Sequence, residues 1–292
     1  MPKCWTSLLP AKIFTKARKL SPKSVNPTGA AANLLSPGPS EESTMSKPAL
    51  YMFAISHYCE KGRWTLDYTG IEHDIKYVAP GPHFRLVKKF KLPGSSVPYV
   101  VTDHEVVHGT GDIIDWADKH TSNGKTLTPA GEQGDQSREI EKRIDDVIGV
   151  HVRRAFYSEM LIEDPGRVKK MLTHNVSLAQ KLIVNAIFPK LRKIMIKRMD
   201  IGSAQGLESI QILEKEIAWL DELLADGRPF LVGDTFSRAD LSAAALLGRT
   251  IQPPQHPFYD HLYTPPKLKA VTSEWRSRPS LQWISKLYEQ YR

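Results

Sequence analysis

The chain has 292 residues, of which 41% are hydrophobic and 25% are charged, as is typical of a globular protein. Its formal net charge of +8 comes largely from residues 1–40, which contain six Lys and Arg residues and no Asp or Glu. The remainder is nearly neutral, so the sequence offers no broad basic face of the kind that binds nucleic acid. No apolar run approaches the roughly eighteen residues of a transmembrane helix.

Residues 1–48 form a separate compositional unit, rich in Ser, Pro, Ala and Lys and free of acidic residues until Glu41. We expect a disordered basic extension, in which "TSLLPAKIFTKARKL" could form an amphipathic helix. This composition is typical of a mitochondrial or plastid transit peptide. The alternatives are an extension without targeting function, or translation that starts at Met45; the protein would then be expected in the cytoplasm.

Residues 49–120 predict alternating strands and helices. The apolar stretch "ALYMFAI" (49–55) predicts a strand, and "YCEKGRWTLDYTG" (58–70) predicts a helix. Further strands are expected over 73–79, 97–103 and 105–109, with a short helical segment at 84–90 and a helix over 110–120. The strand–helix–strand order implies a parallel pair, and the tight turn near residues 103–104 implies an antiparallel one. The fold class expected here is α/β, with a mixed four-stranded sheet.

Residues 121–137 are polar and predict a linker, after which the pattern is entirely helical. Apolar residues at helical spacing predict helices over 138–161, 166–174, 176–198, 206–226, 238–249 and 279–292. We therefore expect an α/β unit over 49–120 and an all-α unit over 138–292.

The chain has two cysteines, Cys4 and Cys59, too few for a disulfide framework. No zinc-ligand spacing and no Gly-rich phosphate loop occur, so we expect neither a metal nor a nucleotide. Ser56 and Cys59 form Ser-x-x-Cys, a broken form of the Cys-x-x-Cys redox motif. Cys59 shares helical spacing with Gly62 and Leu66, which favours a packing role over a redox role.

Four stretches have a common resemblance: "ISHYCEKGRWTLDYTGI", "SSVPYVV", "VVHGTGDIIDWAD" and "GDTFSRADLSAAALL". Over residues 49–292 they resemble the glutathione S-transferase superfamily, most closely its bacterial-like members with a long helical domain. The resemblance implies a thioredoxin-like domain that binds glutathione as co-substrate. It also implies a homodimer that conjugates glutathione to a small hydrophobic electrophile, as in detoxification.

The resemblance also implies the site residues. Ser56 matches the residue that faces the glutathione sulfur, where a hydroxyl and a helix N-terminus favour the thiolate. The pair Val97–Pro98 matches a cis-proline turn whose backbone pairs with glutathione.

Gly109 and Thr110 match the acidic residue and the Ser that hold the γ-glutamyl group. Thr110 keeps a hydroxyl at a helix N-terminus, which suits a carboxylate. Gly109 lacks the acid, so Asp112 or a partner subunit would have to supply it.

Four further residues are weaker candidates. His57 could assist proton transfer, although a lone His is more often a packing residue. His83 and Arg85 match the region of the glycyl carboxylate. Tyr157 would line the pocket for the electrophile.

Two helical segments have other expected roles. Ser237 and Asp240 form a capping box, a structural marker that starts a buried helix. Residues 178–201 are basic and amphipathic, which predicts either contact with an acidic membrane surface or an ordinary helix with one solvated face.

Conjugation has two alternatives. The first is a non-catalytic glutathione- or ligand-binding protein on the same fold, which the missing acid at Gly109 favours. The second is glutathione-dependent reduction of peroxides or mixed disulfides through Cys59.

Overall fold

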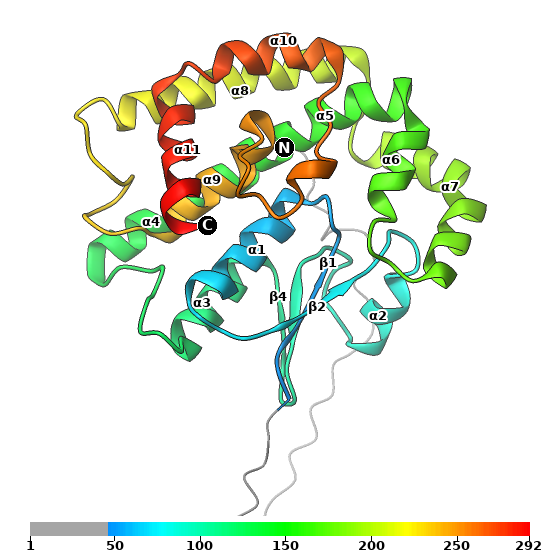
Figure 1. Cartoon of the computed structure of the whole chain (residues 1–292), viewed down its shortest axis with the longest axis horizontal. Helices are drawn as coiled ribbons and strands as arrows, with labels where there is room; N and C mark the ends of the chain where they lie inside the picture. Colours follow the sequence, from blue (N-terminus) through cyan, green and yellow to red (C-terminus); the bar gives the residue numbers. More distant parts are fainter. Residues whose placement is uncertain (1–45) are drawn as a thin grey trace, which may run out of the picture.

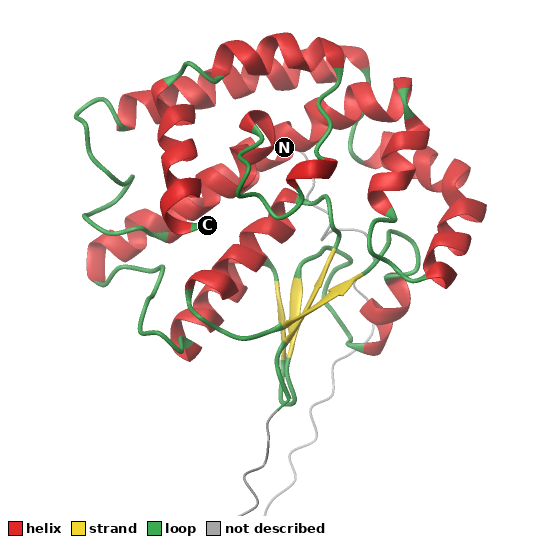
Figure 2. Cartoon of the chain, in the orientation of Figure 1, coloured by secondary structure: helices red, strands yellow, loops and turns green. Residues whose placement is uncertain are grey.

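The computed structural model describes residues 46–292, which form an α/β unit followed by a helical unit (Figure 1). The predicted transit peptide, Met45 and Cys4 lie outside these described residues. The expected fold class is confirmed, since every strand of the described part belongs to one sheet in the first unit (Figure 2).

The first unit contains a four-stranded sheet with three helices. Its elements are β1 (Ala49–Met52), α1 (His57–Tyr68), β2 (Asp74–Tyr77), α2 (Phe84–Lys89), β3 (Tyr99–Val101), β4 (Val106–His108) and α3 (Thr110–His120). The strand order is β2-β1-β3-β4. β1 runs parallel to β2 and antiparallel to β3, and β3 runs antiparallel to β4. The mixed sheet is therefore as predicted.

The strands are shorter than the apolar runs that predict them. β1 ends at Met52, because the backbone N–H of Ser56 donates to the carbonyl of Phe53 at 3.2 Å and closes a turn. β3 begins at Tyr99, directly after the cis peptide bond between Val97 and Pro98. The residues that leave the strands at these ends are the ones predicted to form the site.

The sheet buries an apolar core on its helix-covered face. Leu50 lies opposite Ile75 on one side and Val100 on the other, and Val100 lies opposite Val107. The residues that complete this core come from α1 and α3 and include Cys59, Leu66, Ile113 and Trp116.

The second unit is helical throughout. It comprises α4 (Gly131–Arg143), a π-helical segment η1 (Ile144–Gly149), α5 (Val150–Glu163), α6 (Pro165–Leu172), α7 (Leu178–Arg198), α8 (Ser203–Leu223), α9 (Arg238–Ile251), a short 3-10 turn η2 (Tyr259–His261), α10 (Pro266–Trp275) and α11 (Pro279–Tyr291).

Two features of this unit differ from the sequence prediction. α4 begins at Gly131, inside the range 121–137 predicted as a linker, and α10 was not predicted. The first two turns of α4 are polar and bury only Gly134 and Ser137, so they carry no apolar period. A Cβ at Gly134 would collide with the carbonyl oxygen of Pro129, which explains why a glycine occupies this helical position.

α9 is the centre of the helical unit. All of its residues are buried, and it packs against α1, α4 and α11. The predicted capping box is confirmed: the backbone N–H of Ser237 donates to Asp240 at 2.8 Å. Burial raises the pKa of Asp240 to about 6, although hydrogen bonds from Leu231 and Ser237 offset part of the effect. This carboxylate fixes the start of the most buried helix.

α1 is shared by both units. Its residues Cys59 and Leu66 join the core beneath the sheet, while Trp64 joins the core of the helical unit. The Trp64 indole N–H donates to the carbonyl of Tyr291 at 2.7 Å, and Arg292 pairs with Glu60 at 2.6 Å. The C-terminal end of the chain therefore holds α1 in place, and α1 carries the predicted catalytic serine at its start.

Candidate functional site

Ser56 is the N-cap of α1. Its backbone is extended, with φ −83° and ψ 121°, and its hydroxyl accepts a hydrogen bond from the backbone N–H of Cys59 at 3.3 Å. The side chain is partly exposed. A hydroxyl that accepts from the helix can still donate its own proton, so capping and stabilisation of a nearby thiolate are compatible.

The Val97–Pro98 peptide bond is cis, as the sequence predicts. α1 approaches this turn closely at Gly62, where a Cβ would lie 2.8 Å from Pro98 Cγ. The carbonyl of Pro98 accepts a hydrogen bond from the backbone N–H of Gly109 at 3.4 Å. The structure thus brings the start of α3 against the proline turn, and the proline turn against α1.

Gly109 and Thr110 form the start of α3. Gly109 is the N-cap with φ +109°, a conformation that side chains disfavour, so an acidic residue here would be strained. The Asp112 carboxylate lies 3.7 Å from the place where a Gly109 Cβ would be. Asp112 therefore offers a carboxylate in the region that the missing acid would occupy.

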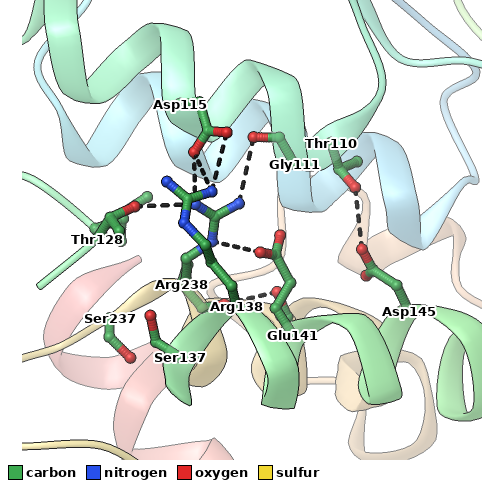
Figure 3. Close-up of polar contacts among 12 residues, drawn as sticks. Thr110, Gly111, Asp115, Thr128, Ser137, Arg138, Glu141, Asp145, Ser237 and Arg238 are labelled. Atoms are coloured by element: carbon green, nitrogen blue, oxygen red, sulfur yellow. Dashed lines mark hydrogen bonds and ion pairs between the residues drawn. The ribbon is translucent and has the colours of Figure 1, made fainter. Parts of the chain in front are cut away.

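A buried ionic network lies beneath Thr110. The Thr110 hydroxyl donates to Asp145 at 3.4 Å (Figure 3). The Lys61 ammonium lies 2.7 Å from the carboxylates of both Asp145 and Glu141. Lys61 is fully buried. Burial raises the pKa of Asp145 despite its ammonium partner, and the neighbouring Glu141 adds to that effect.

Arg238 extends the network to α9. Its guanidinium pairs with Glu141 of α4 and lies 2.6 Å from Asp115 of α3 (Figure 3). The sequence analysis does not identify Lys61, Glu141, Asp145 and Arg238. In this network, Lys61 and Arg238 donate to residues that lie 80 to 127 positions away along the chain. One signal was present: Arg238 follows the cap of an almost entirely apolar helix.

His57 lies at the contact between the two units. Its Nε2 is 2.9 Å from the carbonyl oxygen of Gly149 in η1, so this nitrogen carries the proton and donates it. The ring is buried, which lowers the pKa of His57 to about 3. A neutral, hydrogen-bonded imidazole favours the packing interpretation over proton transfer.

The Cys59 side chain is fully buried in the core beneath the sheet. Burial raises the pKa of its thiol to about 12, and the neighbouring Ser56 hydroxyl offsets only part of that shift. The thiolate is the reactive form of cysteine, so this environment favours packing over redox chemistry.

The structure separates the roles of His83 and Arg85. His83 is buried; its Nδ1 accepts from the backbone N–H of Gly81 at 3.1 Å, and its Nε2 donates to the Ser95 carbonyl at 3.1 Å. Burial lowers its pKa to about 4, so His83 is a neutral structural residue. Arg85 lies exposed on α2, pairs with no carboxylate of residues 46–292, and is available to a ligand carboxylate.

Tyr157 lies on α5 and is partly buried against the core of the helical unit. Ile55 and Tyr58, which flank Ser56, pack against the same core. The first turn of α1 therefore faces the helical unit, where the resemblance expects an electrophile. Burial raises the pKa of the Tyr157 phenol, which keeps its proton available for donation.

Two other classes of site are absent from residues 46–292. This part of the chain holds no group of three or more His, Cys, Asp and Glu side chains placed to bind a metal ion. It also holds no helix with the length and apolar character needed to cross a bilayer.

Two family matches cover much of the chain. Residues 50–125 match the family described as glutathione S-transferase, N-terminal domain, and residues 204–281 match glutathione S-transferase, C-terminal domain. No curated protein matches the sequence significantly.

Many solved structures resemble this one at low sequence identity. The β-etherase LigF from Sphingobium sp. strain SYK-6 is 21% identical, with a TM-score of 0.54, over 82% of this chain and 99% of its own. A glutathione S-transferase domain-containing protein from Marinobacter aquaeolei VT8 is 19% identical, with a TM-score of 0.52, over 80% and 99%. These similarities establish a shared fold.

Proposed function

Because the chain belongs to the glutathione S-transferase superfamily, we propose that it binds glutathione on its thioredoxin-like unit and conjugates the glutathione sulfur to a small electrophile. One observation carries the proposal: α1 contacts the cis Val97–Pro98 turn at Gly62, and Pro98 accepts a hydrogen bond from Gly109 at the start of α3, which supports a site shared by Ser56 and Thr110.

Ser56 would act on the thiol of glutathione. The hydroxyl donates a hydrogen bond to the sulfur, and the N-terminus of α1 adds its positive end, so the thiolate is favoured and the thiol proton passes to solvent. The thiolate then forms a carbon–sulfur bond with the electrophile, and the leaving group departs with the electron pair of the bond that breaks. Cys59 takes no part in these steps.

The start of α3 would hold the γ-glutamyl end of glutathione. The backbone N–H groups in the first turn of α3, beginning with that of Thr110, suit its carboxylate. Asp112 is the carboxylate nearest to the Gly109 position and suits the ammonium group. The proposal thus assigns to Asp112 the role that the resemblance gives to the residue at 109.

The test is retention on immobilised glutathione together with turnover of 1-chloro-2,4-dinitrobenzene. The wild type should be retained and active, whereas Ser56→Ala should be retained and about 10- to 100-fold less active. Asp112→Asn should weaken retention. The proposal would be refuted if the wild-type protein neither bound glutathione nor turned over the electrophile.

A non-catalytic binding protein is the second candidate, and Gly109 is the observation that favours it. Glycine has no side chain, so position 109 lacks the carboxylate that the resemblance expects there. Retention of the wild type on glutathione without turnover of the electrophile would support this candidate over the enzyme.

We also propose that α7 contacts an anionic membrane surface. The helix buries only Val184, Phe188 and Met195, and it exposes Leu178 and Leu182 at 72% and 61%. The same helix exposes four lysines: Lys181, Lys190, Lys193 and Lys197. Exposed apolar residues beside cations are the pattern of a helix that lies on an acidic lipid surface.

Sedimentation with lipid vesicles tests this contact. The protein should pellet with vesicles containing phosphatidylserine and stay in solution with phosphatidylcholine alone. Leu178→Ser with Leu182→Ser should abolish pelleting, while Leu207→Ser on α8, which replaces another exposed leucine, should not. Equal pelleting of all variants would contradict the role of α7.

Two further implications of the resemblance are also proposals. Light scattering at micromolar concentration should give the mass of a homodimer. Residues 1–48 fused to a fluorescent reporter should direct it to mitochondria or plastids, and a cytoplasmic signal would contradict the targeting prediction.

A further inference from the structure

Two arginines of the helical unit lie next to the first turn of α1. His57 donates to the carbonyl of Gly149, and a Cβ at Gly149 would lie 2.8 Å from Leu246 Cδ1 on α9. His57, η1 and α9 therefore contact one another, and His57 is the residue that follows Ser56 in the chain.

Arg153 and Arg249 follow this meeting point by about one helical turn each. Arg153 lies four residues after Gly149, and Arg249 lies three residues after Leu246, so each shares a helix face with the residue at the contact. Both positive charges act on His57 and lower its pKa further, although burial is the larger cause. The two arginines thus share the neighbourhood of His57 and come from different helices, Arg153 from α5 and Arg249 from α9.

Arg249 is buried without an acidic partner. It is 8% exposed, and its Nη2 donates to the Tyr263 carbonyl at 3.3 Å and approaches Met160 Sδ at 3.5 Å. Its guanidinium stacks over the Phe156 ring, 4.5 Å from the centroid. All of these partners are neutral, and no carboxylate of the described residues pairs with it.

Arg153 shows the same deficit. Its Nε is buried and has no hydrogen-bond partner within residues 46–292. The adjacent Arg154, in contrast, pairs with Asp200 and Glu208. Carboxylates therefore neutralise Arg154, whereas Arg153 and Arg249 pair with no carboxylate of residues 46–292.

A buried cation without a counter-ion is costly, so a ligand that supplies the anion would be bound favourably. Arginine binds a carboxylate through two parallel hydrogen bonds. The positive charges of both arginines act on the Tyr157 phenol, whose hydroxyl can donate a third hydrogen bond to the ligand. Apolar neighbours, including Phe156 and Ile55, would cover the rest of such a ligand.

We propose that Arg153 and Arg249 form an anion subsite beside Ser56, and that the electrophile conjugated by this protein carries a carboxylate on an apolar body. The statement about the electrophile rests on the proposed function, whereas the subsite itself does not. It changes the expectation from the sequence, which was a purely hydrophobic electrophile.

The probes are 4-chloro-3-nitrobenzoate and 4-chloro-3-nitrobenzamide, which differ in the negative charge. In conjugation the glutathione thiolate attacks the ring carbon that bears chlorine, a carbon–sulfur bond forms, and chloride leaves with the bonding electrons. Titration calorimetry of the full chain without glutathione measures binding alone, and kcat/KM measures conjugation.

The wild type should bind the benzoate at least tenfold more tightly than the benzamide. Arg249→Gln and Arg153→Gln should each reduce this preference about tenfold or more, in line with the loss of a charged hydrogen bond. Arg249→Lys should retain part of it. Arg276→Gln, which removes an exposed arginine on the α10 side of the helical unit, should leave it unchanged.

Equal affinity of the wild type for the two probes, or a preference that survives in both Gln variants, would overturn the subsite. If Arg249→Gln does not fold, the preference of Arg153→Gln for the benzoate tests the subsite, since Arg153 is partly exposed. Preferential binding of the benzoate without conjugation of either probe would keep the subsite and refute the transferase function. Conjugation of both probes with no preference would do the reverse.

Discussion

The Lys61 ammonium of α1 lies 2.7 Å from the Asp145 carboxylate of the helical unit, and both carboxylate oxygens accept from it. The hydroxyl of Thr110 donates to the same carboxylate. This ion pair therefore joins the two units, and its carboxylate also binds Thr110, a residue of the proposed glutathione site. Packing between the units and the geometry of the start of α3 should respond together when it is broken.

Lys61→Met is expected to destabilise the protein by about 3–5 kcal/mol, because it leaves the Asp145 carboxylate without its cation and removes one of the two cations that pair with the buried Glu141. Urea unfolding followed by circular dichroism measures the loss. Lys142→Met is the matched control, since Lys142 pairs with Asp146 on the surface, and it should have little effect. Similar unfolding midpoints for the two variants would refute a structural role for the buried pair.

Ser56→Ala separates capping from catalysis when it is compared with Ser177→Ala. Both serines are N-caps, and Ser177 accepts from the backbone N–H of Gln180 at 3.4 Å. Each substitution should cost about 1 kcal/mol of stability. Only Ser56→Ala should also lower kcat/KM, by about 10- to 100-fold, because it removes a hydrogen bond to a charged sulfur. Parallel losses of activity would mean that Ser56 only caps α1.

Local patterns explain what the sequence could predict. The strand and helix order, the turn at Val97–Pro98 and the capping box of Ser237 and Asp240 depend on residues within a few positions of one another. Such patterns are legible without knowledge of the fold. The start of α4 was missed because its first turns are polar and carry no apolar spacing.

Contacts between distant segments could not be predicted in the same way. Lys61 and Arg249 look like ordinary helix residues in the sequence, since a charge on a helix is usually solvated. Their burial follows from the packing of α1 against α9, which places Lys61 near carboxylates and Arg249 near none. Long-range ionic pairing therefore distinguishes a structural charge from a ligand-binding one.

Gly62→Ala should weaken glutathione binding. The new Cβ would lie 2.8 Å from Pro98 Cγ, so the proline turn must move away from α1. We expect a several-fold rise in the dissociation constant for glutathione, measured by calorimetry. Gly166→Ala is the control, because its Cβ would meet nothing nearer than 3.8 Å within α6. Unchanged affinity in Gly62→Ala would show that the turn can shift without loss of the site.

The buried imidazole of His57 should make the fold sensitive to acid. Its pKa is about 3 in the folded chain, against about 6.5 when unfolded, so between these values the unfolded chain binds more protons. Stability must therefore fall as the pH is lowered from 6.5 towards 3, by at most about 1.4 kcal/mol per pH unit from this group.

His57→Gln tests this contribution, because the glutamine amide can donate to the Gly149 carbonyl but cannot titrate. Its unfolding free energy should fall less steeply than that of the wild type between pH 6.5 and 4. Asp145 and Asp240, whose raised pKa values act in the opposite direction, are present in both proteins and cancel in the difference. His104→Gln, at an exposed position, should follow the wild-type curve. If His57→Gln follows it as well, the pKa of His57 is not lowered in the folded protein.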